Sequence, residues 1–123
     1  MPAAVGEAAR VLESGGKFSI CVTHPLNDAG VFESDETDAA FVIRDSYYAR
    51  GPFEARFERD GLQITFRGWM YALEDYARAL RDAGFVIACL REPVPTNEDL
   101  RLQPSFERRR RIPLFLQLLA AKR

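Results

Sequence analysis

The sequence has 123 residues, enough for one domain with a modest core, and its 47% apolar and 28% charged residues are ordinary for a globular protein. A formal net charge of −1 argues against a nucleic acid or an anionic membrane as a partner. No apolar run reaches the ~18 residues of a transmembrane helix, and no signal peptide opens the chain, so we expect a cytoplasmic protein.

The first predicted element is an amphipathic helix over residues 3–13, because Val5, Ala8, Ala9 and Leu12 share one helical face. This helix begins abruptly at the N-terminus, as in a chain that starts in mid-domain. Glycines 15 and 16 are expected to end it. Alternating apolar residues then predict a strand over Lys17–Thr23.

The middle of the chain is expected to be an insert. Residues 25–46 are acidic and rich in loop-forming residues, so they predict a loop. Between Phe53 and Arg67 the apolar residues alternate on either side of Asp60-Gly61. An Asp-Gly pair between two alternating runs is a strong signal for a β-hairpin.

The C-terminal part predicts a helix over Leu73–Ala83 and a buried strand over Phe85–Leu90. A helix between two apolar strands predicts a crossover connection and a parallel pair, hence an α/β fold. Residues 92–111 are polar and interrupted by prolines, so they predict a loop. The periodicity of residues 112–119 fits a strand or a helix.

The sequence contains two cysteines and one histidine. Cys21 and Cys89 lie in apolar strand-like runs, so we expect two reduced, buried thiols. Two cysteines and one histidine are too few for an ordinary four-ligand zinc site, so no metal is expected.

Three segments resemble the C-terminal half of a class I S-adenosylmethionine-dependent methyltransferase of the small-molecule type. They are EAARVLESGGKFSICVTHP, LEDYARALRDAGFVIACLREPVP and RIPLFLQLLAAKR, which resemble the family's fifth, sixth and seventh strands with the elements that precede them. The resemblance implies a partial Rossmann-like methyltransferase sheet, with the last strand antiparallel between the other two, and an inserted β-hairpin. It makes residues 1–123 a truncated methyltransferase-like domain in which residues 28–72 cap the substrate.

The same resemblance implies that S-adenosylmethionine is the cofactor of the full-length family. The family binds it in the N-terminal half, which this sequence lacks, and Gly15-Gly16 follow a helix where the cofactor turn follows a strand. We expect no cofactor to bind this chain alone. The resemblance also places one strand between Cys21 and Cys89. The resulting distance between the two cysteines is too large for a disulfide, so both thiols are expected to be free.

No residue is singled out as catalytic. The resemblance puts the strand end at Thr23 and His24 beside the methyl acceptor, and puts aromatic residues around the hairpin in the roof of its pocket. The predicted substrate-binding residues are Thr23, His24, Tyr47, Tyr48, Trp69 and Tyr71. The alternatives are that Thr23 and His24 only shape the exit from the strand and that the aromatics form a hairpin core.

The four arginines from Arg108 to Arg111 are interpreted as a solvated loop, with a phosphate or an acidic partner as the alternative.

These patterns predict part of a methyltransferase that acts on a small-molecule acceptor, supplies the acceptor side of the site and is inactive alone. The alternative is a non-catalytic, dimerising interaction module derived from the same fold, and a third is a carrier of small ligands. A homo-oligomer is expected, formed through the exposed edge of the Lys17–Thr23 strand or through apolar faces.

Overall fold

A computed structural model describes residues 1–44 and 46–123; position 45, within the predicted loop over 25–46, lies outside the described residues. The helices are α1 (Pro2–Val11), α2 (Pro25–Asp28), α3 (Leu73–Asp82) and α4 (Asn97–Leu102), with a 3₁₀ helix η1 (Pro104–Arg110). The strands are β1 (Lys17–Thr23), β2 (Gly30–Phe32), β3 (Phe41–Ile43), β4 (Gly51–Arg59), β5 (Leu62–Met70), β6 (Phe85–Arg91) and β7 (Phe115–Lys122). Of the helices described, none has the length and apolar character needed to cross a membrane.

The main sheet has the strand order β1-β7-β6. Strand β7 is antiparallel to both neighbours, so β1 and β6 run parallel to each other. This confirms the predicted crossover and the predicted antiparallel last strand. The strand begins at Phe115, because Pro113 has no N–H to donate and lies before the ladder.

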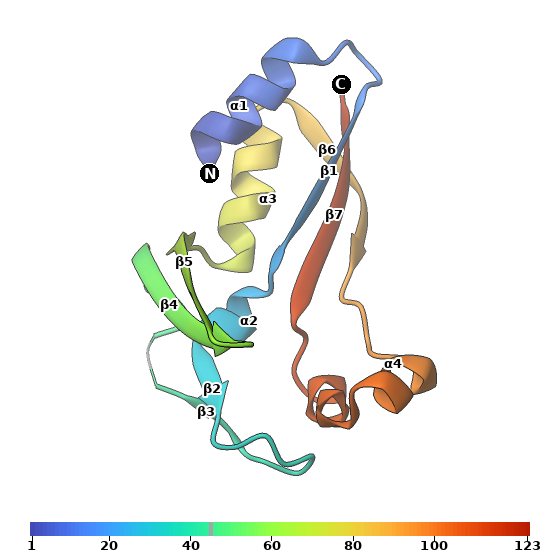
Figure 1. Ribbon diagram of the computed structural model, residues 1–123. Helices are drawn as coiled ribbons and strands as arrows, with labels where there is room; N and C mark the ends of the chain where they lie inside the picture. The colour runs from blue at the N-terminus through green and yellow to red at the C-terminus, as the bar shows by residue number, and fades with distance from the viewer. Residues whose placement is uncertain (45) are drawn as a thin grey trace.

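The core lies between this sheet and the two long helices. Helices α1 and α3 cover the same face of the sheet (Figure 1). Alternate residues of β7, namely Leu116, Leu118 and Ala120, point into this core and are buried. They pack with Val5 and Leu80 from the two helices, so one strand and two helices supply most residues of the core cluster.

The opposite face of the sheet has no helix over it in the described chain, and this corrects the prediction of buried thiols. Cys21 and Cys89 are both exposed and both free. They lie on either side of β7, opposite Gln117 and Leu119 respectively. Their apolar surroundings suggested burial, whereas both helices pack on the other face. The prediction that they form no disulfide is confirmed.

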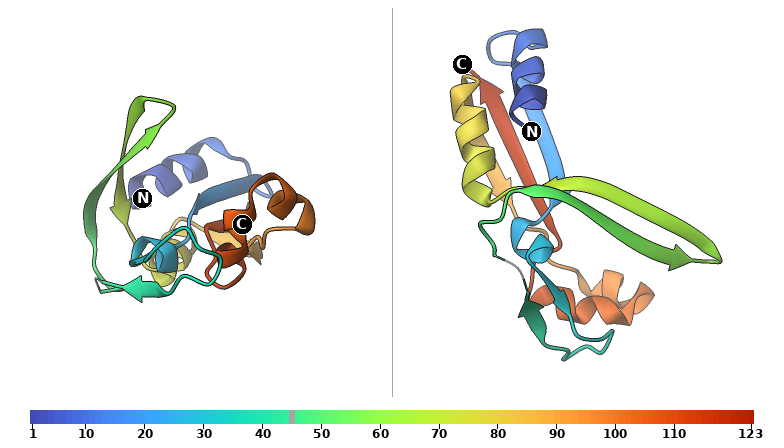
Figure 2. Two further views of the ribbon diagram at one scale, coloured as in Figure 1. Left: turned by 60° about the horizontal axis from the view of Figure 1, so that its bottom comes forward. Right: turned by 90° about the vertical axis from the view of Figure 1, so that its left-hand side faces the viewer.

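The turns follow the predicted glycines. Asp60 and Gly61 both have positive φ, 53° and 75°, as the tight turn of a hairpin requires, so the predicted hairpin is confirmed and extends over β4 and β5. It projects away from the main sheet (Figure 2). Helix α1 ends at Val11, before the predicted position, and Gly15, with φ 81°, shapes the turn into β1.

Two segments predicted as loops contain regular structure. Within residues 25–44 the chain forms the short helix α2 and pairs β2 with β3. Helix α4 begins after Thr96, whose hydroxyl accepts a hydrogen bond from the N–H of Asp99 while the Asp99 carboxylate accepts from the N–H of Thr96. This capping box was readable in the sequence and was missed because the surrounding residues are polar.

Replacing Leu116 by alanine should lower the free energy of unfolding by about 2–5 kcal/mol, because it leaves a cavity in the core. Leu102→Ala on α4 is the matched control, since Leu102 is exposed and its truncation should change stability by less than about 0.5 kcal/mol. Urea unfolding followed by circular dichroism measures both. Equal losses in the two variants would contradict the placement of β7 in the core.

Candidate functional site

The carboxyl end of β1 is fixed by His24, which is only 6% exposed. Its Nδ1 accepts a hydrogen bond from the N–H of Leu26 at 3.0 Å, which caps helix α2. The ring proton therefore lies on Nε2, which donates to Oε1 of Glu92 at 2.8 Å. Because both ring nitrogens have partners within the protein, His24 orients α2 and ties it to the end of β6.

Helix α2 carries a short chain of polar contacts. Thr23 donates to Oδ2 of Asp28 at 3.1 Å, and Asn27 Nδ2 donates to Oδ1 of the same carboxylate at 3.4 Å. The other end of the Asn27 amide, Oδ1, accepts from Arg109 Nη1 at 2.5 Å. Asn27 thus stands between a carboxylate and a guanidinium.

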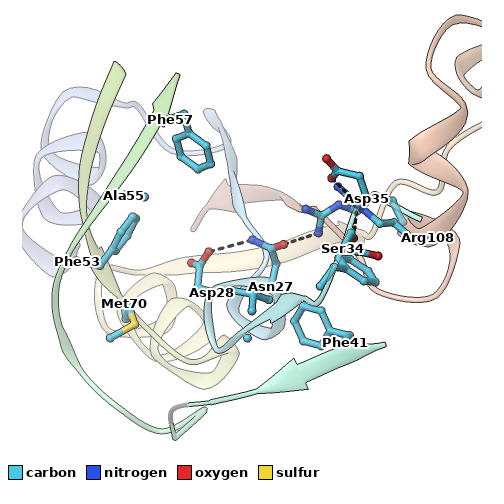
Figure 3. Close-up of a pocket in the computed structure, with 14 residues that line it drawn as sticks. Asn27, Asp28, Ser34, Asp35, Phe41, Phe53, Ala55, Phe57, Met70 and Arg108 are labelled. Carbon is cyan, nitrogen blue, oxygen red and sulfur yellow. Dashed lines mark hydrogen bonds and ion pairs between the residues drawn. The ribbon is translucent and has the colours of Figure 1, made fainter. Parts of the chain in front are cut away.

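Asn27, Asp28 and Arg109 face a cleft of about 540 Å³, which we call the hairpin cleft. One wall comes from the hairpin, through Phe53, Ala55, Phe57 and Met70. Asn27 and Asp28 lie in the middle, and Ser34, Asp35 and Arg108 lie across from the hairpin (Figure 3). The cleft therefore combines an apolar wall with a polar opposite side, as small-molecule sites commonly do.

Three arginines from the run before β7 surround one aromatic ring, and we call Arg108, Arg109 and Arg111 the arginine cluster. Their Cζ atoms lie 5.1, 4.9 and 5.8 Å from the centroid of Phe32. The Arg108 side chain is only 15% exposed. The interpretation of this run as a solvated loop is therefore wrong for Arg108 and Arg109, which contacts with α2, β2 and the following turn partly bury, whereas Arg111 is exposed.

Burial shifts the pKa of two groups that line the cleft. It raises the pKa of Asp28, against the smaller opposing effect of the hydrogen bonds from Thr23 and Asn27. It lowers the pKa of Arg109, and the positive charge of Arg108 adds to this effect. The two groups thus have their charged forms disfavoured by the same partial exclusion of water.

The predicted aromatic residues do not meet in the hairpin cleft. The Tyr47 hydroxyl accepts from the N–H of Leu73 at the start of α3, at 3.1 Å, and that of Tyr71 accepts from the N-terminal ammonium at 2.8 Å. Tyr48 and Trp69 are 73% and 52% exposed. None of these four, nor Thr23 or His24, lines the cleft, although Thr23 holds Asp28 in it. Substrate binding by the six residues stays a prediction.

Sequence reasoning missed the residues that do line the cleft. Phe53, Ala55 and Phe57 belong to the alternating apolar residues of the predicted hairpin, but nothing in the sequence places α2 or the arginine cluster opposite them. Asp28 and Asn27 lay in a segment predicted as a loop. The sequence offers one signal for Asp28, which lies five residues after the strand end at Thr23. Open α/β sheets hold their ligands near such strand ends.

The described residues do not fit a metal ion or an S-adenosylmethionine site. No group of three or more His, Cys, Asp or Glu side chains among them could hold a metal. Gly15 and Gly84, which have positive φ, each follow a helix and precede a strand. A nucleotide-type turn needs the reverse order, with helix N-terminal amides facing the ligand.

No protein-family model and no curated protein matches the sequence. Among solved structures, an S-adenosylmethionine-dependent methyltransferase from Mesorhizobium loti matches with a TM-score of 0.75 and 21% identity over 98% of this chain and 54% of its own. A provisionally assigned methyltransferase of the same kind from Listeria monocytogenes gives 0.70 and 23%, over 100% and 55%.

The chain therefore spans about half the length of these solved structures. At this level of identity the likeness concerns the fold. It confirms the predicted α/β fold class, a partial Rossmann-like methyltransferase sheet with an inserted hairpin.

Two matched substitutions test the pKa shifts. Because folding raises the pKa of Asp28, its contribution to stability is greatest at low pH and is lost as pH rises through the folded pKa. Asp28→Asn should therefore raise the melting temperature more near pH 7 than near pH 3, where both side chains are neutral. A loss of stability that is the same at both pH values would contradict the burial of this carboxylate.

Asp99→Asn makes the same charge change but should have the opposite effect on stability. Hydrogen bonds from the side chain and backbone of Thr96 lower the pKa of Asp99, so its contribution to stability is present at neutral pH and lost as pH falls. This variant should lower the melting temperature near pH 7 and have less effect near pH 3. Thermal unfolding by circular dichroism measures both variants.

Proposed function

We propose that this chain forms the acceptor-binding half of an S-adenosylmethionine-dependent methyltransferase that acts on a small molecule. One observation carries the proposal: in a fold shared with such enzymes, a cleft of small-molecule size opens next to the carboxyl end of β1. Open α/β sheets hold their ligands at the carboxyl ends of their strands. In this proposal the chain corresponds to the C-terminal half of the enzyme and works in the cytoplasm, where its two cysteines stay reduced.

Residues 28–72 are the cap of the substrate site in this proposal, within a single domain over residues 1–123. The hairpin supplies an apolar wall through Phe53 and Phe57. Thr23 and His24 act on the site through other residues, since Thr23 binds Asp28 and His24 caps the helix that carries it. Asp28 is the polar group of the cleft best suited to accept a hydrogen bond from an O–H or N–H group of the acceptor.

The cofactor belongs to the other half of the enzyme in this proposal, so the isolated chain binds none and is inactive. Among the described strands, β1 pairs with β7 alone, so one edge of β1 is available to continue the sheet. The face that carries Cys21 and Cys89 is also uncovered and slightly hollowed. A second set of strands and helices would bury both surfaces.

The alternative is a non-catalytic module in which a second copy covers these surfaces. The same unpaired edge of β1 favours it, because an exposed strand edge is a template for pairing. The module would be a homodimer with a sheet continuous across both chains.

Titration with S-adenosylmethionine tests the main proposal. We expect isothermal titration calorimetry of this chain alone to show no binding at micromolar affinity, because the described glycine turns do not fit the cofactor. The coding sequence upstream of Met1 should continue in frame with a strand, a glycine-rich turn and a helix roughly 100 residues earlier, and the extended protein should bind. Binding by the short chain, or stop codons directly upstream, would contradict the proposal.

Oligomeric state and thiol reactivity separate the two functions. As an incomplete half, the chain should have both Cys21 and Cys89 open to a thiol reagent in the folded state, as their exposure indicates. A homodimer that buries this face would give twice the monomer mass by light scattering and slow the labelling of both thiols. Fast labelling of a monomer would eliminate the module, and slow labelling of a dimer would eliminate the isolated half.

A further inference from the structure

We infer that the hairpin cleft takes an amphipathic anion: a small molecule with an apolar body, an oxyanion that meets Arg109, and a hydroxyl or amino group that meets Asp28. The oxyanion is a carboxylate or a phosphate monoester. This inference rests on the proposed function only where it makes that molecule the methyl acceptor. The binding site itself follows from the contacts of the cleft.

Arg109 is a half-buried cation without a counterion among the described residues. No described carboxylate lies within the 4.0 Å of an ion pair, and its hydrogen bond goes to the neutral amide oxygen of Asn27. A guanidinium carries five N–H donors in a planar fork that fits an oxyanion with two parallel hydrogen bonds. Arg109 lines the cleft, so its remaining donors are available to a ligand there.

Arg108 adds a second positive charge beside Arg109 that an anion would neutralise. Its Nη1 donates to the carbonyl of Ser34 at 2.7 Å and to Asp35 at 2.6 Å, but its buried Nε has no hydrogen-bond partner among the described residues. Asp35 is 92% exposed, so water weakens its ion pair. Of these two adjacent guanidiniums only Arg108 has a carboxylate partner, and the mutual repulsion of the two would fall when an oxyanion binds between them.

The arginine cluster is held in place before any ligand arrives. The ring of Phe32 attracts all three guanidiniums at 4.9–5.8 Å. Arg111 adds hydrogen bonds to the carbonyls of Thr37 and Ala39, and it also faces a neighbouring hollow that contains Asp38 and Glu107. Arg111 does not itself line the hairpin cleft. A fixed cation binds an anion at a lower entropic cost than a mobile one.

Asn27 separates the carboxylate of Asp28 from the guanidinium of Arg109. Its Oδ1 accepts from Arg109 and its Nδ2 donates to Asp28, so the carboxylate and the guanidinium do not pair with each other. One group of the cleft thus accepts a hydrogen bond and the other donates to an anion. Phe53, Phe57 and Met70 form the apolar wall that faces these polar groups (Figure 3).

Three probes with the same phenylpropyl body test this inference: 4-phenylbutyrate, 3-phenylpropyl phosphate and the neutral 4-phenylbutanamide. Isothermal titration of the full chain measures the three affinities. The anion that binds more tightly should have an affinity about tenfold higher than that of the amide, the size expected for a charge-assisted hydrogen bond. The comparison of the two anions tells a carboxylate ligand from a phosphate ester. Equal binding of all three, or no binding of either anion, would overturn the inference without any substitution.

Arg109→Gln should remove most of the preference for the anion and leave the affinity for the amide unchanged. Arg101→Gln is the matched control, because it removes the same charge from an exposed position on α4. Arg109→Lys should retain part of the preference, since a lysine keeps the charge without the planar fork. A preference that survives Arg109→Gln in a folded protein would contradict the role of this residue.

The binding test is independent of the cofactor. Anion binding that depends on Arg109, together with stop codons upstream of Met1, would support the anion site in the cleft and reject the proposed methyltransferase function. A cofactor-binding extended protein whose cleft does not distinguish the anions from the amide would retain the proposed function and reject this inference.

Discussion

The pairing of β7 with both β1 and β6 is the constraint on which the rest of the structure depends. Its buried residues Leu116, Leu118 and Ala120 hold the sheet against α1 and α3. The residue just before the strand, Leu114, accepts the backbone N–H of His24 at 2.8 Å, and Lys122 at its other end donates to the last carbonyls of α1. Because η1 leads directly into β7, the register of this strand also sets where the arginines stand relative to α2.

The placement of both helices on one face of the sheet determines what the other face can do. Strand β1 alternates between half-buried residues toward the helices and exposed residues on the opposite side, where Cys21 lies. In a chain that spans about half of its structural neighbours, an open face and an open strand edge are the two surfaces on which a completing partner would pack. Both proposed functions therefore begin from the same geometry and differ in the identity of that partner.

Local patterns in the sequence predicted β1, β6 and the hairpin, the family resemblance supplied the central strand β7, and neither predicted the cleft. Alternation gave β1 with its bounds, and the Asp60-Gly61 pair gave the hairpin, because each pattern needs only neighbouring residues. The cleft depends on contacts between segments far apart in the chain, such as Arg109 with Asn27 and Arg108 with Asp35. Charge in a polar segment is equally compatible with solvent, so no local pattern could show that a ring from β2 would gather these arginines.

The two sides of the hairpin cleft differ in how firmly they are held, and this difference bears on specificity. The polar side is fixed by the ladder of β7, by the His24 contact with Glu92 and by the stacking of the arginine cluster on Phe32. The hairpin is mostly exposed and, near its base, is tied to α3 by the Tyr47 contact with Leu73 and by ion pairs of Arg50. Fixed polar groups discriminate by charge, because an unpaired buried donor or acceptor is costly. A loosely held apolar wall accepts different shapes, so we expect the cleft to be strict about the ends of its ligand and tolerant of its body.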